Sequence, residues 1–214
     1  MLVTGSGGFI GQRVGALLEE HGATVLGCEP PNGDVLYAAS LPDADYCIHL
    51  AAHKYATTAE DTPATVADLN IRGTANVIDR YGPNVVLAST CKAADPMTVY
   101  GASKLIAERI TLNAGAKVVR FVNVCGSVGS VAEIWADTPA DEPLKVTSCY
   151  RMWMTEAEAV RLLIAALDWP TGRYALDVPD PEAVWETMKR LHPNRAYDFM
   201  LPRRGDRILS LIHI

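Results

Sequence analysis

The chain opens with the stretch Val3-Thr4-Gly5-Ser6-Gly7-Gly8-Phe9-Ile10-Gly11, which places glycines at positions 5, 8 and 11 between an apolar run and an amphipathic segment. In a dinucleotide site, the first glycine allows a sharp turn after a strand, the second lets the backbone approach a pyrophosphate, and the third permits close packing of helix on sheet. The N–H groups and partial positive charge at the helix N-terminus then bind the phosphates. The alternative is a strand-to-helix turn that binds nothing.

The residues that follow favour the dinucleotide interpretation. Apolar residues recur at helical spacing from Ile10 to Leu18, Gly22 is a stop signal, and Ala23 to Gly27 resumes an apolar run typical of a second strand. Glu29 ends that run, where a carboxylate can accept hydrogen bonds from both ribose hydroxyls and repel a 2′-phosphate, which favours NAD over NADP. The alternative for Glu29 is an ordinary solvated charge.

Further along, strand-like and helix-like segments alternate. Apolar runs at 46–51, 85–89 and 118–122 predict strands, and segments near 65–81 and 100–113 predict helices. This alternation predicts an α/β fold with a doubly wound parallel sheet of the Rossmann type. We expect a Rossmann domain over residues 1–125, to which 152–178 return, and a small interleaved substrate-binding lobe over 126–214.

Two local features refine this expectation. Only four residues separate Glu29 from Asp34, where a doubly wound fold ordinarily inserts a crossover helix. The fold is therefore expected in a pared-down form. Near the end of the chain, Asp180-Pro181 predicts an N-cap followed by proline at the first helical position, with Val184, Met188 and Leu191 along one helix face.

Composition excludes several classes of function. The net charge is −6 and the basic residues are not clustered, which argues against a nucleic-acid partner. No apolar run reaches the length of a membrane span, and a secretory signal is not apparent, so a cytoplasmic protein without a membrane partner is expected. The five cysteines are odd in number and lack zinc-ligand spacing, which indicates reduced thiols and no metal site.

Candidate reaction residues lie in the middle of the chain. Tyr100 and Lys104 stand four apart on an expected helix, so both project from one face. An adjacent ammonium and an oxidised nicotinamide favour the phenolate of such a tyrosine, although its ordinary pKa is near ~10. Thr90 follows an expected central strand, where ligands of open α/β sheets bind. The alternatives are an exposed Tyr–Lys pair, and a threonine that satisfies local backbone groups.

Several motifs in register give the chain a family resemblance. It resembles the extended short-chain dehydrogenases/reductases in its glycine stretch, in His49-Leu50-Ala51-Ala52-His53-Lys54, in Asn70 with Gly73-Thr74 and Asn76, and in Tyr100-Gly101-Ala102-Ser103-Lys104. It is similar to their polysaccharide-biosynthesis (CapD-like) nucleotide-sugar dehydratases and epimerases in Ser89-Thr90-Cys91-Lys92-Ala93, Arg120 to Ser127, Gly129-Ser130-Val131, Arg151 to Thr155, and Arg203-Arg204-Gly205-Asp206.

The resemblance implies NAD-dependent chemistry on a UDP-N-acetylhexosamine. Tyr100, helped by Thr90 and Lys104, would take the proton of the sugar 4-hydroxyl while hydride passes from C4 to NAD. In the dehydratases an Asp-Lys pair follows the threonine: the lysine removes the C5 proton and the aspartic acid protonates the departing 6-hydroxyl. Lys92 matches that lysine, but Cys91 occupies the place of the aspartate. Cys91 is therefore either a proton donor, an unhelpful thiolate or an inert buried thiol.

The same resemblance implies the binding residues. Those for the cofactor are Gly5, Gly8, Phe9, Ile10, Gly11, Glu29, Asp34, Val35, Leu50, Ala51, Ala52, Asn70, Tyr100 and Lys104. Those for the substrate are His53, Lys54, Asn123, Arg151 and Arg204. Arg151 and Arg204 suit a diphosphate because guanidinium groups pair well with phosphate oxygens. Each of these polar residues has a structural alternative, as a strand-end cap or a solvated charge.

Three hypotheses about function follow. The first is an NAD-dependent nucleotide-sugar dehydratase that eliminates water across C5 and C6. The second is a UDP-sugar 4-epimerase, which needs only the tyrosine and lysine and gains weight from the loss of the aspartate. The third is a non-catalytic protein that binds NAD or a nucleotide sugar. The oligomeric state stays open, with a homodimer as one alternative.

Overall fold

The computed structural model describes residues 1–202, 208 and 209, and its centre is a sheet of six parallel strands. Their order is β10-β5-β4-β3-β1-β2. Their bounds are β1 (Leu2–Thr4), β2 (Leu26–Cys28), β3 (Cys47–His49), β4 (Val85–Thr90), β5 (Lys117–Phe121) and β10 (Gly172–Tyr174). The predicted α/β, doubly wound, Rossmann-like class is confirmed.

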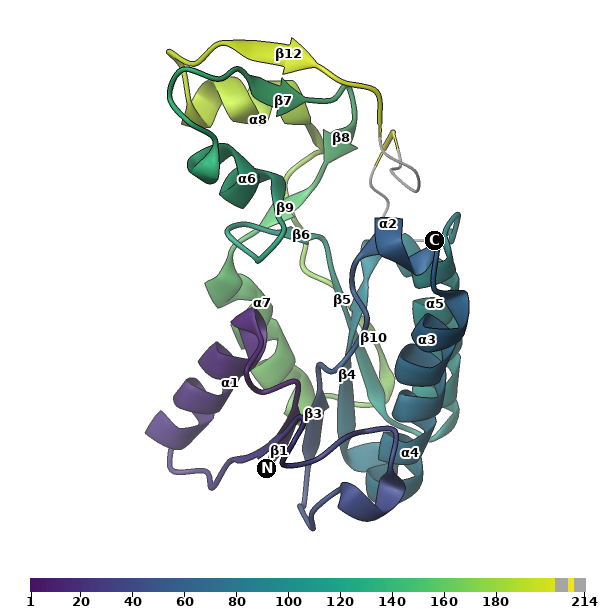
Figure 1. The fold of residues 1–214 in the computed structure, drawn as a ribbon. Helices are drawn as coiled ribbons and strands as arrows, with labels where there is room; N and C mark the ends of the chain where they lie inside the picture. Colours follow the sequence, from purple (N-terminus) through teal and green to yellow (C-terminus); the bar gives the residue numbers. More distant parts are fainter. Residues whose placement is uncertain (203–207, 210–214) are drawn as a thin grey trace.

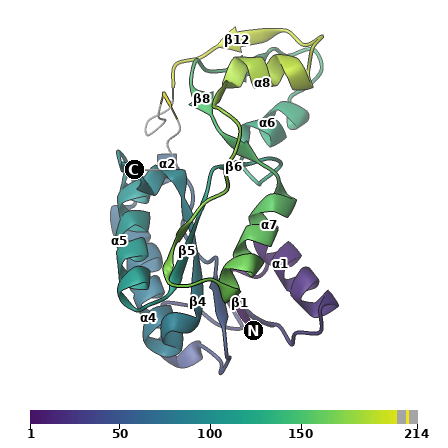
Figure 2. The same ribbon diagram turned by 180° about the vertical axis from the view of Figure 1, so that it is seen from behind.

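Helices cover both faces of the sheet (Figures 1 and 2). One face carries α1 (Phe9–Glu20) and α7 (Glu156–Ala165), and the other carries α3 (Pro63–Ala67), α4 (Gly73–Tyr81) and α5 (Val99–Asn113). A π-helical turn, η2 (Asp68–Arg72), joins α3 to α4. The remaining short helical segments on this side are α2 (Ala56–Ala59), η3 (Gly82–Asn84) and η4 (Cys91–Ala93), whereas η5 (Ala166–Asp168) follows α7 and packs with α1 and α7 on the other face.

The strands are apolar because both faces of the sheet are buried. Successive side chains of a strand point to opposite faces. Leu2 and Cys47 accordingly join one core cluster, beside Val77 of α4, whereas Val3 and Ile48 join the other. Because all neighbouring strands of this sheet pair in parallel, their carboxyl ends lie at one edge of the sheet.

The crossover between β2 and β3 contains no α-helix. Its one helical segment is the 3-10 turn η1 (Ala38–Ser40), as the short spacing between Glu29 and Asp34 indicated. The chain passes from β2 to β3 on the other side of β1, and β2 is an edge strand with β1 as its neighbour in the sheet.

Beyond the sheet, a smaller group of elements packs around Trp135, Leu144 and Met188. It contains α6 (Val131–Asp137), α8 (Val184–Leu191), β7 (Leu144–Val146), β8 (Tyr150–Arg151), β11 (Glu182–Ala183) and β12 (Tyr197–Phe199). The pair β6 (Asn123–Val124) and β9 (Trp153–Met154) lies between this lobe and the sheet (Figure 1). The chain returns to the sheet through α7 and β10, and the proposed division at residue 125 stays a prediction.

The expected helix start at Asp180-Pro181 is wrong. Residues 182 and 183 form β11, which pairs antiparallel with β8, and α8 begins at Val184. The carboxylate of Glu186 accepts a hydrogen bond from the Ala183 N–H at 3.3 Å, so the helix is capped at Ala183. The start of α8 is therefore set by the pairing of β11 with β8, which is distant in sequence, and not by the local Asp-Pro signal.

The cysteines are free thiols. Cys28, Cys47, Cys91 and Cys149 are buried and Cys125 is exposed. This agrees with the reduced thiols that their spacing indicated.

Substitution of Gly11 tests the packing of α1 on the glycine loop. A Cβ at Gly11 would lie 2.9 Å from the Cα of Ser6 and closer still to the Gly5 carbonyl oxygen. Because overpacking costs about 1–3 kcal/mol, Gly11→Ala should lower the free energy of unfolding by about that amount. Urea unfolding followed by circular dichroism measures the change.

Gly15→Ala, in the same helix, is the control. Its Cβ would meet the Val25 side chain at an ordinary 3.9 Å. Because alanine is the better helix former, this variant should be as stable as the wild type or more so. Equal effects of the two substitutions would contradict the packing described.

Candidate active site

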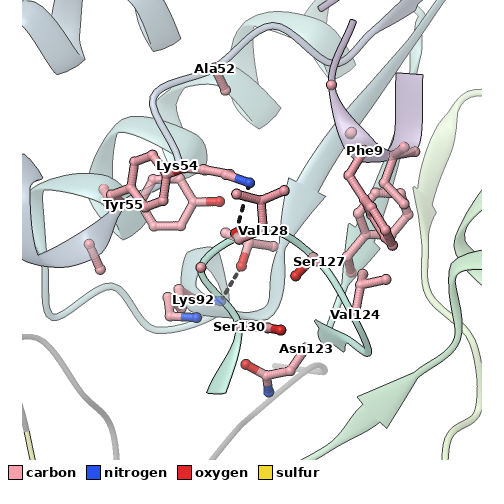
Figure 3. Close-up of a pocket in the computed structure, with 18 of the residues that line it drawn as sticks. Phe9, Ala52, Lys54, Tyr55, Lys92, Asn123, Val124, Ser127, Val128 and Ser130 are labelled. Carbon is pink, nitrogen blue, oxygen red and sulfur yellow. Dashed lines mark hydrogen bonds between the residues drawn. The ribbon is translucent and has the colours of Figure 1, made fainter. Parts of the chain in front are cut away.

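A cavity of about 770 Å³ lies at the carboxyl ends of the central strands. One side is formed by the turns after β1, β3, β4 and β5, and the other by the lobe, including Lys145, Thr147, Arg151 and Trp153. Figure 3 shows part of this cavity, with Phe9 and Val124 on one side and Lys54 and Tyr55 on the other. Ligands of open α/β sheets bind at this edge of the sheet.

The glycine loop forms one end of the cavity. Gly5 has a φ of +68°, which favours glycine, and Gly5, Gly8, Phe9, Ile10 and Gly11 all line the cavity. Gly8 is the N-cap of α1 and provides no side-chain hydrogen bond to it. The first N–H groups of this 12-residue helix are therefore available to an anion.

Glu29 lies beside this loop. Its carboxylate lies against the position that a Cβ of Gly7 would occupy, and it lines the cavity directly after β2. This is where a carboxylate can bind ribose hydroxyls.

Asp34 and Val35 are not among the cavity-lining residues. The Asp34 carboxylate accepts a hydrogen bond from the Leu36 N–H at 2.9 Å, within its own loop. Val35 is buried in the core and packs against Gly73. Their expected contact with adenine stays a prediction.

The chain after β3 forms the next wall. Leu50, Ala51, Ala52, His53 and Lys54 line the cavity.

Asn70 does not line the cavity but lies behind this wall. Its side chain accepts a hydrogen bond from the His53 N–H at 2.7 Å and donates one to the His53 carbonyl at 3.1 Å. Asn70 can therefore affect a bound cofactor only indirectly, by holding the backbone of His53 in the wall.

The expected reaction residues meet at the middle of the cavity. Thr90 ends β4, and Tyr100 and Lys104 lie one turn apart on α5, whose N-cap is Thr98. All three reaction residues line the cavity. The Thr90 side chain lies near enough to Tyr100 to act on its pKa.

Burial controls the charges of this group. It raises the pKa of Tyr100 to about 12, although Thr90 acts to lower it. Burial also lowers the pKa of Lys104 to about 8, against the effect of Glu108, which raises it. The sequence indicated that a neighbouring ammonium favours the phenolate. In the structure, desolvation is the largest effect on Tyr100, and its pKa is raised.

Cys91 and Lys92, adjacent in sequence, separate in the structure. Lys92 lines the cavity, whereas Cys91 is 4% exposed and packs with Val122, Met154 and Ala159. The cavity lining does not include Cys91. A buried thiol was one of the alternatives that the sequence left open.

Four of the five expected substrate residues line the cavity, His53 and Lys54 after β3, Asn123 in β6 and Arg151 in the lobe. The fifth, Arg204, lies outside the described residues. The Lys54 ammonium donates to the Val128 carbonyl at 3.1 Å, which Figure 3 shows beside Tyr55. The Asn123 amide donates to the Met152 carbonyl at 2.9 Å.

The charged residues that line the cavity are mostly basic, although the whole chain has a negative net charge. Among the described lining residues, the basic ones are Lys54, Lys92, Lys104, Lys145 and Arg151. The acidic one is Glu29 alone. A chain of net charge −6 thus concentrates positive charge in one cavity, which suits an anionic ligand.

A buried ion cluster next to this site was not identified from the sequence. Glu108, fully buried on α5, accepts hydrogen bonds at 2.8 Å from Arg120 and Arg173 and one at 2.6 Å from Ser89. Two signals were present in the sequence. Glu108 follows Lys104 by one helical turn, and Arg120 interrupts an apolar strand, where a charge needs a partner.

The comparisons with known proteins identify the family. Residues 32–196 match the family described as "Polysaccharide biosynthesis protein", and the chain belongs to this family. The family resemblance noted in the sequence is confirmed.

Individual relatives carry out different reactions. The chain is 28% identical over 194 residues to a UDP-N-acetylglucosamine 4,6-dehydratase (inverting) of Campylobacter jejuni, a match that covers 82% of this chain and 58% of that protein. It is 31% identical over 157 residues to a UDP-glucose 4-epimerase of Rickettsia bellii, covering 64% and 46%. The chain thus matches only about half the length of these relatives.

A solved structure shows the same fold. The UDP-glucose 4-epimerase of Thermus thermophilus, determined as a complex with NAD, has a TM-score of 0.84 at 19% identity, over 99% of this chain and 89% of that one. Among the described residues of the present chain, no helix combines the length and apolar character needed to cross a bilayer.

Substitution of Glu108 tests the buried ion cluster. Glu108→Gln removes the carboxylate that accepts hydrogen bonds from Arg120 and Arg173, and breaking such a buried pair costs about 3–5 kcal/mol. Urea unfolding should show a loss of that size. Because the carboxylate raises the pKa of Lys104, the variant should also lower that pKa below about 8, as NMR of the lysine side chains would show.

Asp198→Asn is the matched control. It removes the partner of Lys145 in an ion pair whose side chains are 57% and 56% exposed. Such pairs contribute at most about 1 kcal/mol. A Glu108→Gln variant as stable as this control would contradict the role of the cluster.

Proposed function

We propose that this chain is an NAD-dependent enzyme that begins its reaction by oxidising a nucleotide sugar at C4 of the hexose. One observation carries the proposal: the glycine loop, Thr90, Tyr100 and Lys104 line a single cavity whose opposite wall is basic. A nucleotide sugar bound in this cavity would place its diphosphate at the basic wall and a hydroxyl of its hexose near Tyr100.

The residues of the cavity fit NAD. Gly5, Gly8 and Gly11 leave room for a pyrophosphate at the N-terminus of α1. Glu29 would hold the ribose hydroxyls and disfavour a 2′-phosphate. A solved neighbour of the same fold is a complex with NAD. When bound, NAD supplies a hydride acceptor, and the positive charge of its oxidised ring favours the phenolate form of a nearby tyrosine.

The chain's own residues then have distinct tasks. Tyr100 takes the proton of the sugar 4-hydroxyl, and Thr90, which lines the cavity near Tyr100, orients that hydroxyl. Lys104, 3% exposed, holds the nicotinamide ribose and stabilises negative charge on Tyr100. Lys54, from the chain after β3, and Arg151, from the lobe, bind the diphosphate.

Elimination of water across C5 and C6 is the outcome that we propose first. A ketone at C4 acidifies the C5 proton, and the amine of Lys92 lines the same cavity as Thr90 and Tyr100. Lys92 takes the C5 proton, and the 6-hydroxyl departs as water once it receives a proton. The hydride taken from C4 would then return to C6 while C5 takes a proton from solvent, which closes the cycle and leaves a sugar that has lost one water. A UDP-N-acetylhexosamine is the proposed substrate, in keeping with the dehydratase relative.

Epimerisation at C4 is the second candidate, and one observation favours it. Among the described lining residues Glu29 is the only acidic one, it lies at the glycine loop, and Cys91 packs into the apolar core. A side-chain acid for the 6-hydroxyl is therefore not evident near Lys92. Return of hydride to the opposite face of the C4 ketone needs no such acid.

A product analysis with a tyrosine variant tests both steps. The protein with NAD is incubated with UDP-N-acetylglucosamine in deuterated water, and the products are followed by mass spectrometry and NMR. We expect a sugar that has lost one water and gained deuterium. Tyr100→Phe should lower turnover about 100-fold or more, whereas Tyr37→Phe, at a 67% exposed tyrosine outside the cavity, should not.

Other results would change the assignment. An intact sugar inverted at C4 would select the epimerase. Unchanged turnover by Tyr100→Phe would contradict the mechanism. Binding of NAD with no turnover on a panel of UDP- and dTDP-sugars would indicate a non-catalytic binding protein.

A further inference from the structure

A buried histidine lies behind the wall that follows β3. His49 is 1% exposed, and both of its ring nitrogens meet hydroxyl groups. Nδ1 lies 2.7 Å from Oγ1 of Thr4, at the end of β1, and Nε2 lies 3.1 Å from Oγ1 of Thr74, on α4. The ring therefore connects two strands of the sheet to a helix beneath the cavity.

The remaining contacts of the two hydroxyls fix the direction of these hydrogen bonds. Oγ1 of Thr4 accepts from the N–H groups of Leu50 and Ala51, both at 3.1 Å, so its own proton is given to Nδ1. Oγ1 of Thr74 donates its proton to the Asn70 carbonyl at 2.7 Å, so it accepts one from Nε2. Both ends of the ring independently require the neutral tautomer with the proton on Nε2.

The network continues to the helix that carries Tyr100. Besides holding both backbone groups of His53, the Asn70 amide donates to Oγ of Ser103 at 2.9 Å. That hydroxyl donates to the Tyr100 carbonyl at 2.8 Å. One set of buried hydrogen bonds thus joins the wall at 50–53 to the turn after β1 on one side and to α5 on the other.

We propose that Thr4, His49 and Thr74 are positioning residues that hold the wall at Leu50 and Ala51 in the conformation that binds the dinucleotide. The wall passes close to the glycine loop: a Cβ at Gly5 would lie 3.0 Å from the Ala51 nitrogen. A shift of this backbone would narrow the space for the cofactor. Burial and the nearby Lys104 lower the pKa of His49 to about 3, which is consistent with a neutral ring. This inference rests on the proposed binding of NAD.

Binding of NAD⁺ to Thr4 variants, measured by isothermal titration calorimetry, tests the role without relying on activity. Thr4→Val keeps the shape of the side chain but leaves the Ala51 N–H and Nδ1 of His49 without their partner. Because unsatisfied buried groups are costly, we expect the dissociation constant to rise about tenfold. Thr4→Ser restores the hydroxyl and should bind as the wild type does.

Thr111→Val is the matched control. Thr111 is fully buried, and its hydroxyl donates to the Ala107 carbonyl within α5 at 2.8 Å, away from the cavity lining. Its loss should lower the melting temperature as much as the Thr4 substitution does, but leave NAD⁺ binding unchanged. Equal binding by the wild type and Thr4→Val would overturn the inference, as would weakened binding by Thr111→Val to the same extent.

Nitrogen-15 NMR of histidine-labelled wild-type protein tests the network even if Thr4→Val fails to fold. At pH 7, the resonance that disappears in His49→Gln should show the neutral ring with the proton on Nε2. A charged ring, or a proton on Nδ1, would overturn the inference. A wild-type protein that does not bind NAD⁺ at all would instead contradict the proposed function, so the two failures are distinguishable.

Discussion

The close approach of two backbone segments at the carboxyl edge of the sheet is the constraint on which the cavity depends. The turn at Gly5 lies against the chain after β3, and Gly11 of α1 lies against Gly5 and Ser6. A side chain at either glycine would force the segments apart. The space for a pyrophosphate therefore exists because these positions lack a Cβ and because the adjacent hydroxyl of Thr4 binds the backbone of Leu50 and Ala51.

Around this constraint, buried polar groups determine the chemistry that the cavity can support. Lys104 and Tyr100 are both shifted toward their neutral forms by burial, and Glu108 acts against this shift at Lys104. The ring of His49 stays neutral between two threonines. Lys54, after β3, and Arg151, in the lobe, are exposed or half-buried cations that line the same cavity and retain contact with water, and we propose that they bind the diphosphate. The cavity thereby separates the groups suited to proton transfer from those suited to binding.

Sequence patterns predicted those parts that depend on spacing along one element. The glycine stretch predicted the turn and α1, and the four-residue interval from Tyr100 to Lys104 predicted a shared helix face. The side of the backbone from which a residue projects was harder to predict. Cys91 and Val35 point into the core, and Asn70 reaches the cavity wall only through the backbone of His53. Neighbouring elements decide these orientations, and a single sequence does not reveal them.

The dependence on neighbouring elements also explains two features that were not predicted correctly from the sequence. The start of α8 is set by pairing of β11 with β8, and the cluster around Glu108 joins α5 to β4, β5 and β10. A buried charge in an apolar strand, as at Arg120, indicates that a partner exists but does not identify it. The local motifs were sufficient for the class of fold and for naming residues that the structure brings to one cavity, and tertiary contacts were required for the rest.

The central claim is that oxidation of the sugar comes first. Stopped-flow absorbance tests it most directly, with the NAD-loaded protein mixed with UDP-N-acetylglucosamine and the band of reduced nicotinamide recorded during single turnovers. The account predicts that this band rises before product appears and decays as the cofactor is reoxidised. Formation of product without any reduced nicotinamide, at a time resolution shorter than the turnover, would contradict it.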